Sequence, residues 1–318
     1  MSVPGPILVT GAAGFVGARL ARTLADQGSE THAVLSPSSS PWRLDGESRL
    51  IRHAVDLRDA EAVQRLVDVV QPAVIYNLAS YGAYPHQSDP RRTIETNVLG
   101  LTNLLLAAER VDYRLFVHTG SSSEYGRKRA PMQECDELEP ESVYGASKAA
   151  QSLFCRQWAQ QRGRPIVVFR LFSVYGPLEE PTRFIPRLLT AHLDDAPIAL
   201  VSRETSRDFI FVDDVVEALM LVDRLASVGG SILNLGTGTQ TSLEGVVQAL
   251  ERVTGRAVKA QWGTMPPRPW DTDTWVADAT RLRRDLQWNP SVSVADGLAR
   301  SLRWLQGNRR YYPAAADR

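Results

Sequence analysis

The sequence predicts an α/β protein in which helices cover both faces of one parallel, doubly wound sheet. Short apolar runs that suit buried strands alternate with segments of helical periodicity through the first half of the 318-residue chain. Polar or glycine-rich turns follow several of these runs, at the strand ends where open parallel sheets bind their ligands. The length also allows a smaller, mostly C-terminal α/β lobe.

The first strand and helix are joined by a turn with three glycines. The apolar run 7–10 leads into Gly11, Gly14 and Gly17, and residues 18–24 then have helical spacing. Glycines permit a tight turn and let a pyrophosphate approach the N–H groups at a helix N-terminus, where the helix dipole favours negative charge. The turn therefore predicts a dinucleotide cofactor, although a turn that only packs a helix on a strand has the same pattern.

A second strand is expected at 30–35, and the loop after it bears on the choice of cofactor. Sites that select NAD usually place an acidic residue there for the ribose 2′-hydroxyl, whereas NADP needs an arginine for its 2′-phosphate. The loop has no acidic residue but contains Ser36, Ser38, Ser39 and Arg43. This favours NADP(H) and leaves NAD(H) open, and the serines would also suit a plain polar turn.

Further strands and helices alternate along the rest of the chain. Strands are expected at 50–57, 73–79, 114–119, 165–171, 208–212 and 232–238, and helices at 60–70, 92–109, from 144 onward, 183–192, 243–254 and 294–306. This order assigns residues 1–171, with 208–236 returning, to a dinucleotide-binding domain. Residues 172–207 and 237–318 are expected to form a second lobe.

A tyrosine and a lysine share one face of the helix that begins near residue 144. Tyr144 and Lys148 are four residues apart, so their side chains project together. A nearby ammonium favours the phenolate and would lower the tyrosine pKa from its usual value of about 10, which suits acid–base chemistry. Ser121, after the strand 114–119, is placed to hydrogen-bond the same reacting oxygen. Such a pair alone is common on helix surfaces.

Together these features resemble the extended short-chain dehydrogenase/reductase family of nucleotide-sugar epimerases, dehydratases and ketoreductases. The likeness covers essentially the whole chain and rests on the order and spacing of motifs at 10–17, 56–57, 77–79, 97–100, 121–126, 144–148, 170–177, 207–214 and 268–271. It implies a doubly wound parallel Rossmann sheet and an NAD(P)-dependent enzyme acting on a nucleotide-diphosphate sugar. It also implies a homodimer in which two helices of each subunit form a four-helix bundle.

The resemblance assigns roles to individual residues. Tyr144 is the catalytic acid or base, Lys148 holds the nicotinamide ribose and lowers the tyrosine pKa, and Ser121 orients the substrate oxygen. The residues expected at the cofactor are Gly11, Gly14, Phe15, Val16, Gly17, Ser36, Arg43, Asp56, Leu57, Leu78, Ala79, Ser80, Asn97, Tyr144 and Lys148. Those expected at the substrate are Tyr81, Ser122, Ser123, Ser173, Arg207, Arg268 and Asp271, with Tyr84 and His86 as further candidates. No metal site is expected.

Three departures from the family pattern bear on the reaction. The 4,6-dehydratases carry an Asp-Glu pair where this chain has Ser122 and Ser123, so dehydration is not expected. Ser173 replaces an Asn that would touch the substrate, and Trp270 replaces a Gly near the nucleotide, so the sugar and the base stay open. With the NADP-type loop, the sequence favours a ketoreductase of a nucleotide-bound 4-keto-6-deoxyhexose.

Two alternatives stay open beside this reading. An NAD-dependent nucleotide-sugar epimerase, which oxidises and re-reduces the sugar on one resident cofactor, would use the same residues. A regulator that senses dinucleotide without catalysis usually lacks the Tyr/Lys pair, so the presence of Tyr144 and Lys148 counts against it.

Composition argues against several other classes. The 36 Lys and Arg residues balance 36 Asp and Glu residues, so no net charge draws the chain to nucleic acid or an anionic membrane. Cys135 and Cys155 are too few for a disulfide framework or a four-ligand metal site. No apolar run approaches the ~20 residues of a membrane span, and the first residues lack a signal-peptide pattern. We therefore expect a cytoplasmic enzyme with no nucleic-acid or membrane partner.

Overall fold

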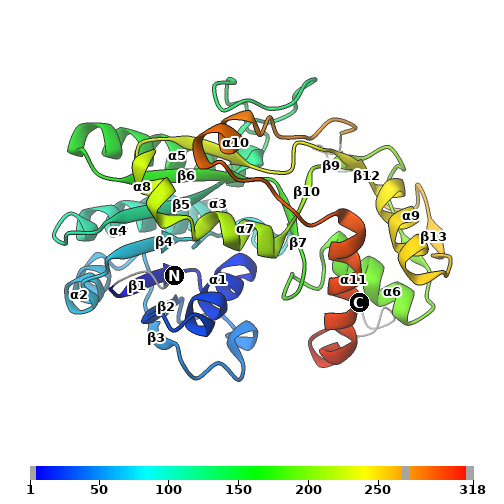
Figure 1. Ribbon diagram of the computed structural model, residues 1–318, viewed down its shortest axis with the longest axis horizontal. Helices are drawn as coiled ribbons and strands as arrows, with labels where there is room; N and C mark the ends of the chain where they lie inside the picture. Colours follow the sequence, from blue (N-terminus) through cyan, green and yellow to red (C-terminus); the bar gives the residue numbers. More distant parts are fainter. Residues whose placement is uncertain (1–4, 267–271, 313–318) are drawn as a thin grey trace.

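The computed structural model describes residues 5–266 and 272–312, and its centre is a parallel sheet (Figure 1). The strands of this sheet lie in the order β11-β6-β5-β4-β1-β2-β3, and each pairs in parallel with its neighbours. Their bounds are β1 (Ile7–Thr10), β2 (Thr31–Leu35), β3 (Ile51–Ala54), β4 (Val74–Asn77), β5 (Leu115–Ser121), β6 (Ile166–Leu171) and β11 (Ile232–Leu235). Strand order reverses between β1 and β4, which confirms the doubly wound α/β fold and marks the expected ligand crevice.

Helices cover both faces of this sheet and enclose two separate cores. One face packs against α1 (Phe15–Asp26), α7 (Val212–Leu219), α8 (Val222–Ser227) and α10 (Thr280–Leu286), and the other against α2 (Ala60–Val70), α4 (Gly100–Ala108) and α5 (Val143–Arg162). Along β1, Ile7 and Val9 lie in the first core and Leu8 in the second. Because both faces of β1 are buried, its sequence is a continuous run of apolar residues and does not alternate with polar ones.

Among the described residues, the second lobe is built from short strand pairs and three helices. Strand β7 (Ser173–Tyr175) pairs with β10 (Phe209–Phe211), β9 (Ser206–Arg207) with β12 (Thr241–Ser242), and β8 (Ile198–Ala199) with β13 (Ala260–Gln261). The helices are α6 (Phe184–Leu193), α9 (Leu243–Thr254) and α11 (Val294–Gly307), which share a third core. The strand expected at 208–212 thus pairs with β7, and β11 is the one that joins the central sheet. The division into domains stays a prediction.

The helix expected at 92–109 differs from the prediction in two ways. It begins earlier, with α3 (Pro90–Ile94), because Asp89 caps its N-terminus by accepting hydrogen bonds from the Arg91 and Arg92 N–H groups. It then passes through a π-helical turn, η2 (Glu95–Leu99), before α4. This turn contains the buried Asn97, whose side chain faces the site described next.

Candidate active site

A cavity of ≈ 1310 Å³ runs along the carboxyl ends of the central strands and into the lobe. Its lining joins the glycine turn after β1, the ends of β4 and β5, the start of α5 and the segment 171–187 of the lobe. Segments far apart in the sequence therefore meet at one crevice, where the fold predicts a ligand.

The glycine turn leads into the N-terminus of α1, whose first backbone N–H groups have no side-chain cap and face this cavity. Gly11 has a φ of +68°, and a Cβ there would lie 2.6 Å from the Ala79 backbone nitrogen. Gly17 packs against the turn, since its Cβ would lie 2.2 Å from the Gly11 carbonyl oxygen. Helix α1 has no side-chain cap and no acidic residue in its first turn. Its first N–H groups and the positive end of its dipole thus suit the pyrophosphate of a dinucleotide, so this part of the cavity fits the predicted cofactor.

Asp56 and Leu57, two of the residues expected at the cofactor, line the cavity beyond the glycine turn. The Asp56 carboxylate accepts hydrogen bonds from Arg58, at 2.6 Å from Nη2, and this contact lowers the pKa of Asp56. Leu78, Ala79 and Ser80 follow β4 and also line the cavity.

Asn97 fixes the backbone that follows these residues. Its side-chain amide accepts from the Tyr81 N–H (2.8 Å) and donates to the Tyr81 carbonyl (2.9 Å) and to the Ser147 hydroxyl (2.8 Å). Because Ser147 lies on α5, one side chain ties the loop after β4 to the helix that carries Tyr144. Asn97, which is expected at the cofactor, thus braces the backbone beside the cavity and is not among the residues that line it.

Arg43, which the sequence suggests as a phosphate ligand, lines the cavity, but protein groups already hold its guanidinium. It lies in the 3-10 helix η1 (Trp42–Leu44), and only 7% of its surface is exposed. Its guanidinium donates to the Leu178 carbonyl (2.7 Å), the Ala13 carbonyl (3.3 Å) and the Glu180 carboxylate (2.9 Å). These contacts favour a structural role for Arg43 over the predicted contact with a 2′-phosphate.

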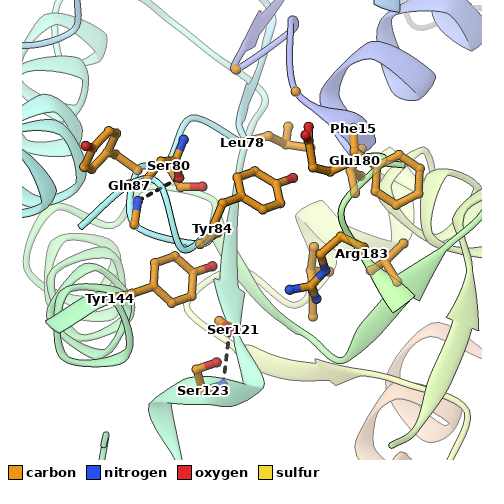
Figure 2. Close-up of a pocket in the computed structure, with 18 of the residues that line it drawn as sticks. Phe15, Leu78, Ser80, Tyr84, Gln87, Ser121, Ser123, Tyr144, Glu180 and Arg183 are labelled. Carbon is orange, nitrogen blue, oxygen red and sulfur yellow. Dashed lines mark hydrogen bonds between the residues drawn. The ribbon is translucent and has the colours of Figure 1, made fainter. Parts of the chain in front are cut away.

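Tyr144, Lys148 and Ser121 meet at the centre of the cavity. Ser121 ends β5, and Tyr144 and Lys148 lie in the first turns of α5, whose N-terminus is capped by Ser142 through a 3.0 Å bond from the Gly145 N–H. Figure 2 shows the Tyr144 ring directed into the cavity near Ser121 and Tyr84. The Ser121 hydroxyl, which also lines the cavity, accepts a hydrogen bond from the Ser123 N–H at 3.1 Å.

The pKa of Tyr144 moves in the opposite direction from the prediction. Burial disfavours the phenolate and raises the pKa of Tyr144 to about 12, against the hydrogen bond from Ser121 and the positive charge of Arg183. Burial likewise lowers the pKa of Lys148 to about 8, against the negative charge of Glu124. The expected lowering of the tyrosine pKa is therefore wrong for this pocket, which holds the phenol protonated and ready to donate.

A buried ion pair behind Ser121 was not found from the sequence. The Glu124 carboxylate accepts from the Ser121 N–H (2.8 Å), the Ser152 hydroxyl (2.9 Å) and Arg170 Nε (2.7 Å). Arg170 also donates to the Tyr125 hydroxyl at 2.8 Å, and both ionic side chains are almost fully buried. One available signal was a single arginine inside the apolar run 165–171, because such a residue needs a buried partner.

The wall opposite Tyr144 carries polar side chains from two loops (Figure 2). Tyr84 projects from the loop after β4 and stacks on His86, with ring centroids 5.6 Å apart. Arg183, at the N-terminus of α6, lies across the cavity. Burial raises the pKa of both Tyr84 and Tyr144, and the positive charge of Arg183 opposes that rise. The sequence did not single out Arg183, because only the fold places it opposite α5.

The predicted substrate residues have separate environments. The Trp275 indole donates to the Ser122 hydroxyl at 3.0 Å, so Ser122 anchors the lobe beside β5. Ser123 and Ser173 line the cavity. Arg207 also lines it and stacks over Trp275, with its guanidinium carbon 5.3 Å from the ring centroid. Arg268 and Asp271 lie outside the described residues.

Within 5–266 and 272–312, no group of His, Cys, Asp and Glu side chains is arranged to hold a metal ion. Among the helices of the same residues, none is long and apolar enough to cross a membrane.

Comparisons with known proteins identify the family of these motifs. The family model described as "NAD dependent epimerase/dehydratase family" matches residues 7–236. The chain is 28% identical to the uncharacterized UDP-glucose epimerase YtcB of Bacillus subtilis, over 94% of this chain and 97% of that protein. It is 30% identical to a dTDP-glucose 4,6-dehydratase of Streptomyces griseus, over 96% and 95%. The crystal structure of Bacillus cereus UDP-glucuronic acid 4-epimerase with UDP-glucuronic acid and NAD superposes with a TM-score of 0.83, at 25% identity over 95% and 99%.

Proposed function

The chain belongs to the NAD-dependent epimerase/dehydratase family, and from this membership we propose that it reduces a nucleotide-bound 4-keto-6-deoxyhexose at C4. It is an NAD(P)-dependent enzyme of the extended short-chain dehydrogenase/reductase type. The observation that carries the proposal is the meeting of Tyr144, Ser121 and Lys148 in a cavity that continues to the open N-terminus of α1.

The chain's own residues supply the proton and the orientation that carbonyl reduction needs. A bound nicotinamide supplies the hydride to the carbonyl carbon. Tyr144 donates its hydroxyl proton to the carbonyl oxygen, since its raised pKa keeps that proton in place at neutral pH. Ser121 donates a hydrogen bond to the same oxygen, and Lys148 holds the nicotinamide ribose from the next turn of α5.

Dehydration is the least supported reaction of the family. Elimination of water needs an acid and a base beside the sugar. Ser122 and Ser123 stand where the dehydratases have carboxylates, and Ser122 is already bonded to Trp275. A serine hydroxyl cannot replace a carboxylate as the base, because the hydroxyl stays protonated at neutral pH whereas a carboxylate is ionised.

The cofactor proposed for net reduction is NADP(H), drawn from the cellular pool. In its support, the loop after β2 has serines and no carboxylate that would select a ribose 2′-hydroxyl. The second candidate is an NAD-dependent nucleotide-sugar 4-epimerase with a resident cofactor. It is favoured by relatives such as the Bacillus cereus 4-epimerase, whose structure holds NAD.

Product analysis separates these two candidates. The purified protein would be offered a panel of nucleotide 4-keto-6-deoxyhexoses with NADH or NADPH, and the products identified by mass spectrometry. A ketoreductase gives a product heavier by two hydrogen atoms and consumes NADPH. Nucleotide 4-hydroxy sugars would be offered in parallel without added cofactor and their products resolved by NMR. Tightly retained NAD, together with inversion at C4 of such a sugar, would instead identify an epimerase.

Replacing Tyr144 with phenylalanine tests the catalytic assignment. We expect Tyr144→Phe to lower kcat by about 10²- to 10⁴-fold, the usual contribution of a general acid, with unchanged affinity for NADP(H) by titration calorimetry. Tyr311→Phe is the matched control, since it removes a phenol outside the cavity lining. Unchanged turnover in Tyr144→Phe would refute the role of this residue.

We also propose that the protein forms a homodimer through helices α3 to α5. Large apolar side chains are exposed on this surface, including Ile94 (53%), Leu106 (49%), Leu153 (44%) and Phe154 (43%). Exposed apolar groups gathered on neighbouring helices are typical of an interface between subunits. Light scattering of the intact protein would test this assembly.

A further inference from the structure

We propose that Arg92, and not Arg43, is the cation that binds the 2′-phosphate of NADP(H), together with the hydroxyls of Ser36 and Ser38. This inference rests on the proposed NADP-dependent reduction and names the residues that would select that cofactor. It concerns the end of the cavity far from Tyr144, where α3 approaches the loop that follows β2.

The serine loop presents its hydroxyls as a group. Ser36 and Ser38 lie with their hydroxyl oxygens 3.1 Å apart, and the Ser39 hydroxyl donates to the Ser36 carbonyl at 2.7 Å, which holds the loop in a turn. Ser36, Ser38 and Ser39 all line the cavity. Each hydroxyl can donate one hydrogen bond, so the loop suits the acceptor-rich oxygens of a phosphate.

Arg92 reaches this loop from the helix α3, 54 residues further along the chain. Its Nη2 donates to the Ser38 hydroxyl at 3.2 Å. The guanidinium also stacks on the Tyr81 ring, 4.8 Å from the centroid, and the Tyr81 backbone is held at both its N–H and its carbonyl by Asn97. The guanidinium is therefore positioned before any ligand arrives, which limits the entropy lost on binding.

The charge of Arg92 is left without a carboxylate partner. Nearby, Asp56 pairs with Arg58, and Glu95 pairs with Arg58 and Arg91. Within the part of the chain that the structure describes, no carboxylate lies within ion-pair distance of Arg92, although its charge contributes to lowering the pKa of Asp56. A dianionic phosphate next to Ser38 would supply the missing counter-charge and accept charge-assisted hydrogen bonds.

Arg43 differs from Arg92 in each of these respects. It is buried, its guanidinium already has three protein acceptors, and one of them is the Glu180 carboxylate at 2.9 Å. A phosphate at Arg43 would have to displace that carboxylate. At Arg92 it displaces only a hydroxyl contact.

Fragment binding isolates the 2′-phosphate from the rest of the cofactor. We would measure the binding of adenosine 2′,5′-bisphosphate and 5′-AMP, and of NADP⁺ and NAD⁺, by titration calorimetry. For the wild type we expect the 2′-phosphorylated member of each pair to bind more tightly. We expect Arg92→Gln to weaken only those two ligands, by about 10- to 100-fold, as for loss of a hydrogen bond to a charged group.

Arg91→Gln is the matched control, because Arg91 is the adjacent arginine, is 88% exposed and pairs with Glu95 away from the cavity lining. It should leave both pairs of affinities unchanged. Ser38→Asp serves as a second variant: a carboxylate there repels a phosphate and accepts from a 2′-hydroxyl, so NAD⁺ should bind more tightly. Loss of folding cannot produce that gain.

Two results would overturn the inference, and they differ in what else they affect. If wild type prefers the 2′-phosphorylated ligands and Arg92→Gln keeps that preference, Arg92 is not the phosphate ligand, and the reductase proposal stands. If wild type does not prefer them and retains NAD, both the Arg92 assignment and NADPH-dependent reduction fall.

Discussion

Single residues behind the cavity set the position of Ser121. The carboxylate of Glu124 holds the Ser121 backbone N–H, and its charge is balanced by Arg170 in the strand β6. Burial raises the pKa of Glu124 even though Arg170 opposes the rise, so the pair is maintained against a desolvation cost. The orientation of the proposed catalytic serine thus depends on a pair that contacts no substrate.

Glu124→Gln tests this dependence. The glutamine amide would place an N–H group against hydrogen-bond donors that in the wild type face the carboxylate oxygens of Glu124. The buried positive charge of Arg170 would then have no negative partner. We expect the free energy of unfolding to fall by about 3–5 kcal/mol, measured by urea denaturation. Glu139→Gln, which alters an exposed pair with Lys128, should change it by less than about 0.5 kcal/mol. A loss below about 1 kcal/mol in Glu124→Gln would contradict the role of the pair.

At the scale of elements, the approach of α1 to β1 forms the dinucleotide end of the cavity. Gly17 allows the helix to contact the Gly11 carbonyl, and no side chain occupies the helix N-terminus. The same scale includes the π-helical turn η2, which brings Asn97 to the loop after β4. Both features position backbone groups beside the cavity: the first N–H groups of α1 and the loop after β4. Their position depends on the path of a helix more than on the chemistry of a side chain.

Gly17→Ala tests the helix contact. The new Cβ would lie 2.2 Å from the Gly11 carbonyl oxygen, so α1 must move away from β1. Overpacking of this kind costs about 1–3 kcal/mol, and we expect both a lower melting temperature and weaker binding of NADP⁺ and NAD⁺. Gly307→Ala, at the end of α11 where nothing lies within 4 Å, should leave cofactor binding unchanged and should not lower the melting temperature. Unchanged cofactor binding in Gly17→Ala would show that α1 does not hold the pyrophosphate.

At the scale of the whole molecule, the segment 178–180 joins the sheet to the lobe. Arg43 donates to the Leu178 carbonyl from the sheet side, and the Tyr312 hydroxyl donates to the Glu179 carbonyl at 2.6 Å from the C-terminal side. The Glu179 carboxyl is buried at this junction, and burial raises its pKa to about 8, against the charges of Arg183 and Arg43.

The stability of the molecule should therefore depend on pH through Glu179. In the folded chain this carboxyl keeps its proton up to about pH 8, whereas in the unfolded chain it ionises near pH 4.3, at about its ordinary pKa. The contribution of this carboxyl to the free energy of unfolding is fully present at pH values below its pKa in the unfolded chain. That contribution is lost as the pH rises through its pKa in the folded chain. A variant without the Glu179 carboxyl should therefore not show this fall in the free energy of unfolding at high pH.

We expect Glu179→Gln to gain on the order of 4 kcal/mol in free energy of unfolding relative to wild type between pH 5 and pH 9, measured by urea unfolding at both pH values. Glu61→Gln, at an exposed position on α2, should change the free energy of unfolding by the same amount at both pH values. A wild-type minus variant difference that is the same at pH 5 and pH 9 would mean that Glu179 does not titrate in this range.

The sequence by itself determined the features that local patterns encode. The order of strands and helices, the glycine turn and the Tyr144/Lys148 pair all follow from periodicity, backbone freedom or a four-residue spacing, which need no knowledge of distant residues. The fold class and the family were correct for this reason.

Only the tertiary structure decided the contacts between residues far apart in the sequence and the pKa shifts that follow from burial. Arg43 meets Leu178 across 135 residues, Glu124 meets Arg170 across 46, and Arg92 meets Ser38 across 54. No local pattern reports such contacts, since they form where chain segments pack together. The direction of the Tyr144 pKa was missed for the same reason: the loss of hydration in a folded cavity outweighs neighbouring charges, and hydration is a property of the packed molecule.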